Sequence, residues 1–139
     1  MVSDMSCADP VELQKVFLER FQSLDIDGLM ELYEDDAVFV GQSGEVAAGK
    51  AAVREALSSL LALPGVEFDY HPTFVSHAGD SALMHARWSL DAQGPDGVPI
   101  ALSGVTVEVA RQGDCGWRYL FDSPFGVVGT SAAGAGGDE

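Results

Sequence analysis

The stretch DIDGLMELYEDDAVFV, residues 25–40, decides the fold. Its first half spaces apolar side chains as a helix does, which predicts a short helix from Asp25 or Asp27 to about Tyr33. Its second half places an acidic triplet before the β-prone run AVFV, which predicts a turn followed by a short strand over 38–40. A helix directly followed by a strand indicates a mixed α+β domain rather than a helical bundle or an all-β fold.

Two longer helical patterns flank this stretch. Asp9-Pro10, with Glu12 two residues later, combines a capping side chain, a proline suited to the first helical position and an acid in the first turn. We expect this helix to run to about Ser23. A third helix is predicted after Gly49 and ends at Leu63-Pro64-Gly65.

After Pro64 the hydrophobic period changes from helical to alternating. Turn sequences divide the rest of the chain into four predicted strands, at about 66–76, 81–92, 99–112 and 116–122. The short connections favour antiparallel hairpins. We therefore expect three N-terminal helices packed on one face of an antiparallel sheet, within a single domain over 9–126 and between disordered segments 1–8 and 127–139.

Alternation along the strands assigns side chains to the two faces of the sheet. In strand 81–92 the even-numbered side chains, Met84 and Trp88 among them, are predicted to face the helices. In strand 99–112 the odd-numbered set that includes Val107 is assigned to that face, and Arg118, Leu120 and Asp122 share one face of the last strand. The opposite face is mixed, and the residues that could make it apolar enough for dimerisation are Leu83, Leu102, Thr106, Tyr119 and Phe121.

Composition excludes several classes of partner. The 139 residues include 22 Asp and Glu against 7 Lys and Arg, for a net charge of -15, so binding to nucleic acid or to an anionic membrane surface is not expected. No apolar run approaches the roughly 18 residues of a membrane span, and no leader pattern occurs, so we expect a cytoplasmic protein. Cys7 and Cys115 do not form a disulfide framework, and no metal or nucleotide-cofactor motif is present.

Four segments together carry a family resemblance: the helix with Phe17 and Phe21, DIDGLMELYEDDAVF, AGKAAVREAL (48–57) and GWRYLFDSPFG (116–126). With them the chain, from about residue 11 to 126, resembles the SnoaL-like and ketosteroid-isomerase-like branch of the nuclear transport factor 2-like superfamily. The resemblance implies a cone-shaped, cystatin-like α+β roll around an apolar pocket, commonly dimeric through the outer face of the sheet. It implies no particular activity, because this fold hosts isomerases, dehydratases, cyclases, binding proteins and assembly modules.

The resemblance also implies where ketosteroid isomerases would hold their catalytic groups. The position of the base falls on Gly41, that of the tyrosine on Phe17, and that of the second acid at or next to Val107. None of these three residues carries the required group. We therefore predict that the protein is not a ketosteroid isomerase that uses this set of groups.

Asp122 is the candidate catalytic residue, since alignment with the isomerases directs it into the cone. A carboxyl group in an apolar cavity has a raised pKa and can act as a general acid or base. The alternative is a strand-end aspartate bound to backbone groups. The histidines, His71, His77 and His85, form no recognisable triad or metal set, and Asp35-Asp36 is typical of a turn.

The leading hypothesis is a protein that binds a small hydrophobic, ring-containing or polyketide-like molecule without a cofactor, as an isomerase, cyclase or dehydratase. Two alternatives remain: a non-catalytic dimeric module that binds a ligand or a protein, and a structural scaffold with no occupied pocket. In the leading hypothesis the predicted pocket residues are Phe17, Phe21, Phe39, Leu57, Met84, Trp88, Val107 and Leu120.

Overall fold

The computed structural model describes residues 7–126. Residues 1–6 of the predicted disordered segment 1–8, and the whole of the segment 127–139, lie outside the described residues. In chain order the elements are α1 (Pro10–Gln22), α2 (Ile26–Met30), β1 (Tyr33–Val40), β2 (Val46–Ala48), α3 (Lys50–Leu61), β3 (Glu67–Ala78), β4 (Ser81–Gln93), β5 (Pro99–Val105), β6 (Val107–Gly113) and β7 (Gly116–Ser123).

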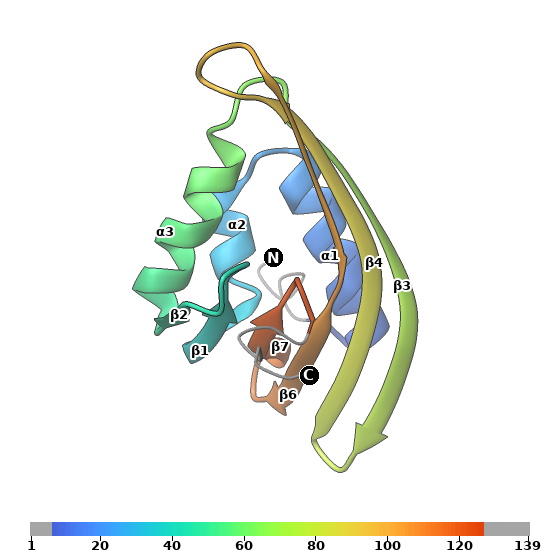
Figure 1. The fold of residues 1–139 in the computed structure, drawn as a ribbon. Coiled ribbons are helices and arrows are strands. Elements are labelled where there is room, and N and C mark those ends of the chain that lie inside the picture. Colours follow the sequence, from blue (N-terminus) through green and yellow to red (C-terminus); the bar gives the residue numbers. More distant parts are fainter. Residues whose placement is uncertain (1–6, 127–139) are drawn as a thin grey trace, which may run out of the picture.

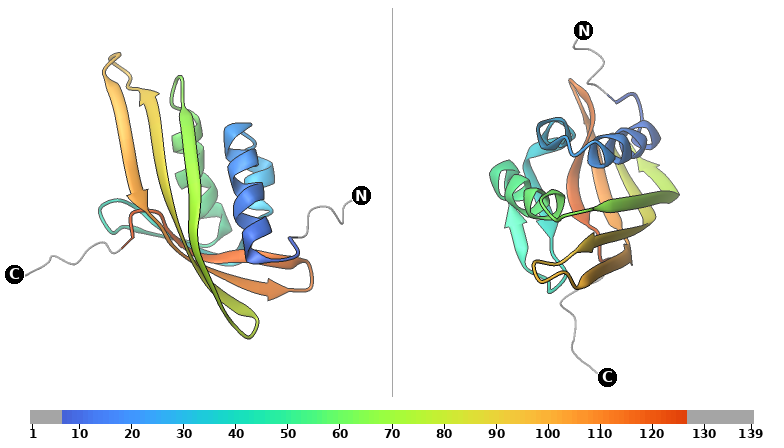
Figure 2. Two further views of the ribbon diagram at one scale, coloured as in Figure 1. Left: turned by 90° about the vertical axis from the view of Figure 1, so that its right-hand side faces the viewer. Right: turned by 90° about the horizontal axis from the view of Figure 1, so that it is seen from above.

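The predicted α+β fold class is confirmed: three helices pack on one side of a curved, mainly antiparallel sheet (Figure 1). The strand order is β2-β1-β7-β6-β4-β3. β5 lies outside this order and pairs with the C-terminal half of β4, whereas β6 pairs with its N-terminal half. Only the β1–β7 pair among these is parallel. Figure 2 shows the upper parts of β3, β4 and β5 standing beside α1 and α3, while β6 and β7 cross beneath the helices. The sheet thus wraps the helices as a cone does.

Capping side chains fix the starts of α1 and α2. The Asp9 carboxylate accepts a hydrogen bond from the Glu12 amide at 2.8 Å, and the Asp25 carboxylate accepts one from the Gly28 amide at 2.9 Å. The predicted end of the second helix near Tyr33 is wrong, because α2 ends at Met30 and Tyr33 already opens β1. Pairing explains the early strand, since the Leu32 carbonyl accepts a hydrogen bond from the Tyr119 amide at 2.7 Å.

The predicted strand 99–112 is two strands that meet at Thr106. β5 pairs with the second half of β4 and β6 with the first half, so the sheet bends between them. At the junction Thr106 bonds Ala86 twice: its amide donates to the Ala86 carbonyl at 2.8 Å, and its hydroxyl accepts from the Ala86 amide at 2.8 Å. The threonine thereby continues the ladder across the break.

The face assignment of β5 and β6 is inverted relative to the sequence prediction. Trp88 lies opposite Gly104, and Met84 lies opposite Glu108. Directly paired residues point to the same face, so the even-numbered side chains turn inward with the inward set of β4. Thr106 and Glu108 are buried, whereas Val105 is half exposed. The alternating pattern does not fix the register between β4 and β5. That register decides which set of side chains faces inward, and it is the reason that the predicted and observed faces differ.

A second correction follows from an irregularity in β7. Ala110 pairs with Tyr119 and Val109 with Phe121, so Leu120 is an extra residue in the ladder. The extra residue places both Tyr119 and Asp122 on the inner face. The predicted outer position is therefore wrong for Tyr119, and it is also wrong for the buried Thr106. It is wrong for Leu102 as well, because Leu102 lies opposite Leu90, which faces inward.

Two predicted outer-face residues, Leu83 and Phe121, lie where the sequence placed them, whereas Cys7 does not. Leu83 and Phe121 are 39% and 45% exposed, as an outer-face position requires. Cys7, expected in a disordered segment, is buried, and its carbonyl accepts a hydrogen bond from the Trp117 amide at 3.0 Å. Within residues 7–126 no helix is long and apolar enough to cross a membrane. The cytoplasmic location stays a prediction.

Candidate functional site

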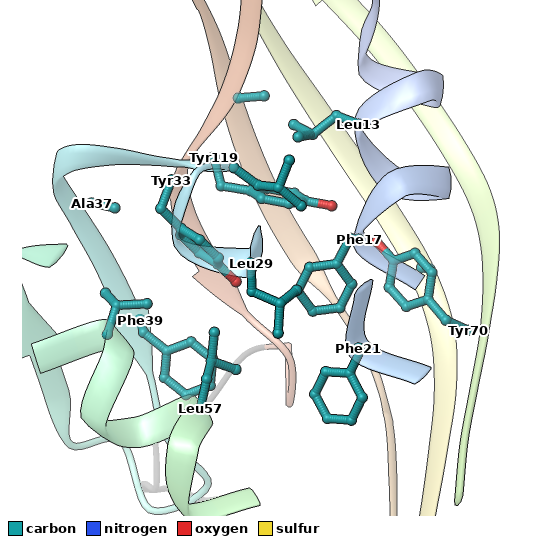
Figure 3. Packing of buried hydrophobic residues seen from close by; sticks show 14 of the residues in the cluster. Leu13, Phe17, Phe21, Leu29, Tyr33, Ala37, Phe39, Leu57, Tyr70 and Tyr119 are labelled. Carbon is teal, nitrogen blue, oxygen red and sulfur yellow. The ribbon is translucent and has the colours of Figure 1, made fainter. Parts of the chain in front are cut away.

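A cavity of about 310 Å³ lies between α1, α3 and the inner face of the sheet. Aromatic rings form much of its wall, and the hub of the wall is Phe17, whose ring centroid lies 5.5 Å from that of Tyr70 and 5.9 Å from that of Phe21. Figure 3 shows Phe17 pointing from α1 into the space between Tyr119, Tyr70 and Phe21. The exposed residues Gln42 and Glu45 border the same cavity, so they mark its side open to solvent.

Five of the eight predicted pocket residues line this cavity, together with the candidate acid Asp122; the five are Phe17, Phe21, Phe39, Leu57 and Trp88. The other three do not. Met84 is fully buried in the core, and Val107 is turned to the other face by the register of β6. Leu120 is the extra residue of β7, which separates it from the inward pair Tyr119 and Asp122.

Two carboxyl groups meet at the buried end of the cavity. Asp122 and Glu108 lie directly opposite each other on β7 and β6 and are only 5% and 2% exposed. Tyr33 donates its hydroxyl proton to Asp122 Oδ2 at 2.6 Å. Glu108 accepts at both oxygens, from Gln14 Nε2 at 3.0 Å and from the Tyr70 hydroxyl at 2.7 Å.

Burial sets the protonation of this pair. Loss of hydration raises the pKa of Glu108 to about 8, and the neighbouring Asp122 charge adds to the rise. Loss of hydration also raises the pKa of Asp122 to about 6, against the opposing effect of the hydrogen bond from Tyr33. The two groups titrate as a pair, and at neutral pH they hold about one proton between them.

Three tyrosines surround the pair. Burial raises the pKa of Tyr33 and of Tyr70 well above the ordinary value, and the adjacent carboxyls raise both further. Burial likewise raises the pKa of Tyr119. Figure 3 shows the Tyr119 and Tyr70 hydroxyls turned toward each other, although the Tyr119 hydroxyl forms no hydrogen bond of full geometry with any described residue. All three remain protonated donors at neutral pH.

Glu108 is the functional candidate that sequence reasoning missed. The expected position of the second acid was at or next to Val107, and the side chain that faces the cavity there is Glu108. The statement that all three isomerase groups are missing is therefore wrong for this acid. The usable signal was a charged residue with only apolar side chains on either side of it, in the run Val107-Glu108-Val109-Ala110. Gly41 and Phe17 do line the cavity, and neither supplies a base or a hydroxyl.

The remaining candidates lie away from the cavity. His85 Nδ1 lies 2.8 Å from the Thr106 carbonyl oxygen, His77 packs edge-on against Trp117, and His71 is exposed. Asp35 and Asp36 form surface ion pairs with Lys50 and Arg111 rather than a converging acid pair. Across residues 7–126, no group of three or more His, Cys, Asp or Glu side chains is placed to hold a metal ion.

A short loop shapes the open side of the cavity. The Gly41 amide donates a hydrogen bond to the Glu45 carbonyl at 2.9 Å, and the Glu45 side chain folds back over Gly41. A Cβ atom on residue 41 would lie only 2.6 Å from Glu45 Oε2. Because Gly41 has no side chain, the carboxylate of Glu45 can occupy the space beside it.

The cone-shaped α+β fold is that of a nuclear transport factor 2-like domain. The aromatic cavity, with its buried acid pair, is a pocket of the size of a small ligand. The SnoaL-like domain family model matches residues 15–115, and the chain belongs to this family. No curated protein matches the chain.

Solved structures share the fold at low sequence identity. A ketosteroid isomerase-like protein from Erwinia carotovora atroseptica is 21% identical, with a TM-score of 0.70 over 80% of this chain and 88% of that one. An NTF2-like protein with a cystatin-like fold from Novosphingobium aromaticivorans is 21% identical, with a TM-score of 0.70 over 90% and 86%. A provisionally assigned dehydratase of the NTF2-like family from Streptomyces avermitilis is 20% identical, with a TM-score of 0.68 over 81% and 91%. These likenesses concern the fold.

Proposed function

We propose that this protein binds a small, largely apolar molecule in the cavity and acts on a polar group of that molecule with the Glu108–Asp122 pair. The observation that carries the proposal is the position of two buried carboxyls at the inner end of an aromatic cavity. A cavity of about 310 Å³ with few polar groups is typical of a site for a small ring-containing ligand.

The chemistry we propose is proton transfer without a cofactor, as in an isomerase, cyclase or dehydratase. At neutral pH the pair shares about one proton, so one carboxyl donates a proton while the other accepts one. The mechanism differs from that of the ketosteroid isomerases, because Gly41 and Phe17 provide neither the base nor the tyrosine of that set. Tyr33 and Tyr70 hold the two carboxyls in place.

A non-catalytic dimeric binding module is the second candidate, and the outer face of the sheet favours a dimer. Leu83, Val109 and Phe121 lie side by side across β4, β6 and β7 through direct cross-strand pairing. Both outer members of this stripe are more than a third exposed. A second copy of the chain is the partner we propose for this apolar stripe.

Filling the cavity tests the proposed function. Ala56 lines the cavity from α3, whereas Ala51 is exposed on the same helix. We expect Ala56→Trp to weaken binding of the neutral fluorescent probe N-phenyl-1-naphthylamine by about tenfold or more, while Ala51→Trp leaves it unchanged. Equal probe binding by both variants would place the binding site elsewhere and refute the proposal.

A further inference from the structure

We propose that the ligand of this cavity is an apolar, ring-bearing amine that binds as its ammonium ion. This inference rests on the proposed function and names the chemical class of the molecule. It follows from the charge of the lining, the hydrogen-bond groups that the lining presents and the aromatic rings that surround them.

Among the described residues, the only charge that the cavity lining can carry at neutral pH is negative, from Glu45 and from the proton-sharing acid pair. Glu45, Glu108 and Asp122 border the cavity, and no Lys, Arg or His is among the described residues that line it. The chain as a whole has a net charge of -15. An anionic ligand would therefore enter against both the local and the overall potential, whereas a cation is attracted by both.

The inner end of the cavity presents carboxyl oxygens, and four of the donors around it are already used. The proton shared by the two carboxyls and the Tyr119 hydroxyl are the exceptions. The hydroxyl protons of Tyr33 and Tyr70 bind Asp122 and Glu108. Gln14 Nε2 also donates to Glu108, and the indole nitrogen of Trp88 donates to the Pro124 carbonyl. A ligand that offers N–H donors meets these carboxyl oxygens better than one that offers only acceptors.

Aromatic rings line the same cavity as the two acids. Phe68 is the centre of one wall: its ring stacks on Phe21 at 4.0 Å between centroids and lies 6.3 Å from that of Trp88. Phe17 contacts Phe68 edge-on at 6.2 Å. Rings arranged around a cation attract it through their π faces, and this attraction grows when water is excluded.

The protonation of the acids fits the same ligand class. Without a cation nearby, burial holds the pKa of both Glu108 and Asp122 above the ordinary range. The titratable groups that face the pair are Tyr33 from β1, Tyr70 from β3 and Tyr119 from β7, all of them neutral. A bound ammonium ion would supply the missing positive charge, lower both pKa values and release protons.

Three probes with the same naphthalene ring separate charge from shape: 2-naphthylmethylamine, 2-naphthylmethanol and 2-naphthoate. Isothermal titration calorimetry measures their binding to the full chain. We expect the amine to bind about tenfold or more tightly than the alcohol, and the carboxylate to bind least. Titrations in buffers of different ionisation enthalpy should show that protons are released when the amine binds.

Charge-removing variants and pH test the source of this preference. Asp122→Asn and Glu108→Gln should reduce the preference for the amine over the alcohol several-fold, whereas the exposed control Asp114→Asn should keep it. The wild-type chain gives a second test that needs no variant. From about pH 8 to about pH 5 the amine should bind more weakly while alcohol binding changes little, because the pair takes up protons.

Each outcome decides between the two proposals. If the alcohol or the carboxylate binds as tightly as the amine, the ammonium class is wrong while the proposed function stands. If none of the three probes binds, the proposed function fails and the ammonium class fails with it. A preference for the amine that persists at about pH 5 and in both cavity variants would assign the selectivity to another site and overturn the inference.

Discussion

Glu108 and Asp122 show how much a single residue's surroundings decide. Each would be a solvated carboxylate in the unfolded chain, and each loses its hydration where β6 meets β7. The hydrogen bonds from Gln14, Tyr33 and Tyr70 offset part of that loss without removing it, because both pKa values stay raised. The fold therefore holds a proton that the same residues would release in water.

This linkage predicts a pH-dependent stability. A carboxyl with a raised folded-state pKa stabilises the fold fully below its unfolded pKa, and that contribution is lost as pH rises through the folded value. For Glu108 the loss occurs between about 4.5 and about 8. We expect the melting temperature of the wild type to fall between about pH 5 and 8, and Glu108→Gln to flatten this fall.

The control for that experiment is Glu67→Gln, which removes the same charge from an exposed position on β3. Its pH profile should follow the wild type. Equal slopes for the wild type and Glu108→Gln would contradict the assignment of a buried, protonated Glu108.

At the scale of elements, the sequence predicted the type of most helices and strands but not their registers. Asp9-Pro10 gave a correct helix start, since capping is a local interaction. The start after Gly49 was also correct, although Gly49 offers no capping side chain. The inward turn of Glu108 and Tyr119 was not predictable in the same way. It depends on the pairing of Trp88 with Gly104 and on the extra residue Leu120, and both are set by contacts between strands.

Thr106 is the residue on which the β5–β6 junction depends. Its hydroxyl oxygen accepts a hydrogen bond from the amide of Ala86, which is buried within β4. We expect Thr106→Val, of similar shape, to reduce the free energy of unfolding by about 1–3 kcal/mol, because that amide loses its partner. Urea denaturation measures the change.

The matched variant Thr106→Ser keeps the hydroxyl and removes only a methyl group. It should cost clearly less than the valine substitution. If serine destabilised as much as valine, packing of the methyl group rather than the hydrogen bond would hold the junction together.

At the scale of the whole molecule, the family resemblance predicted the cone and the cavity, and five of eight proposed wall residues border it. The second acid was not predicted, because a resemblance at the level of a motif places a residue only to within one position. In a strand, one position is the difference between the core and the solvent. Val107 and Glu108 are the example in this chain.

The proposed dimer also belongs to this scale. Phe121→Asp would place a charge at the β7 end of the apolar stripe on the outer face, where the aromatic ring is 45% exposed. We expect this variant to be monomeric by sedimentation velocity at concentrations at which the wild type is dimeric. Val98→Asp, at an exposed position in the β4–β5 turn, is the control and should stay dimeric. A wild-type chain that is monomeric at all concentrations tested would refute the proposed dimer.

The central claim is that a proton-sharing pair of carboxyls closes the inner end of an aromatic cavity. Carbon-13 NMR of the side-chain carboxyls, followed over a pH titration, measures this directly for Glu108 and Asp122. We expect raised pKa values for both groups, about 8 for Glu108 and about 6 for Asp122. Titration of both groups in the ordinary range of about 4 would contradict it.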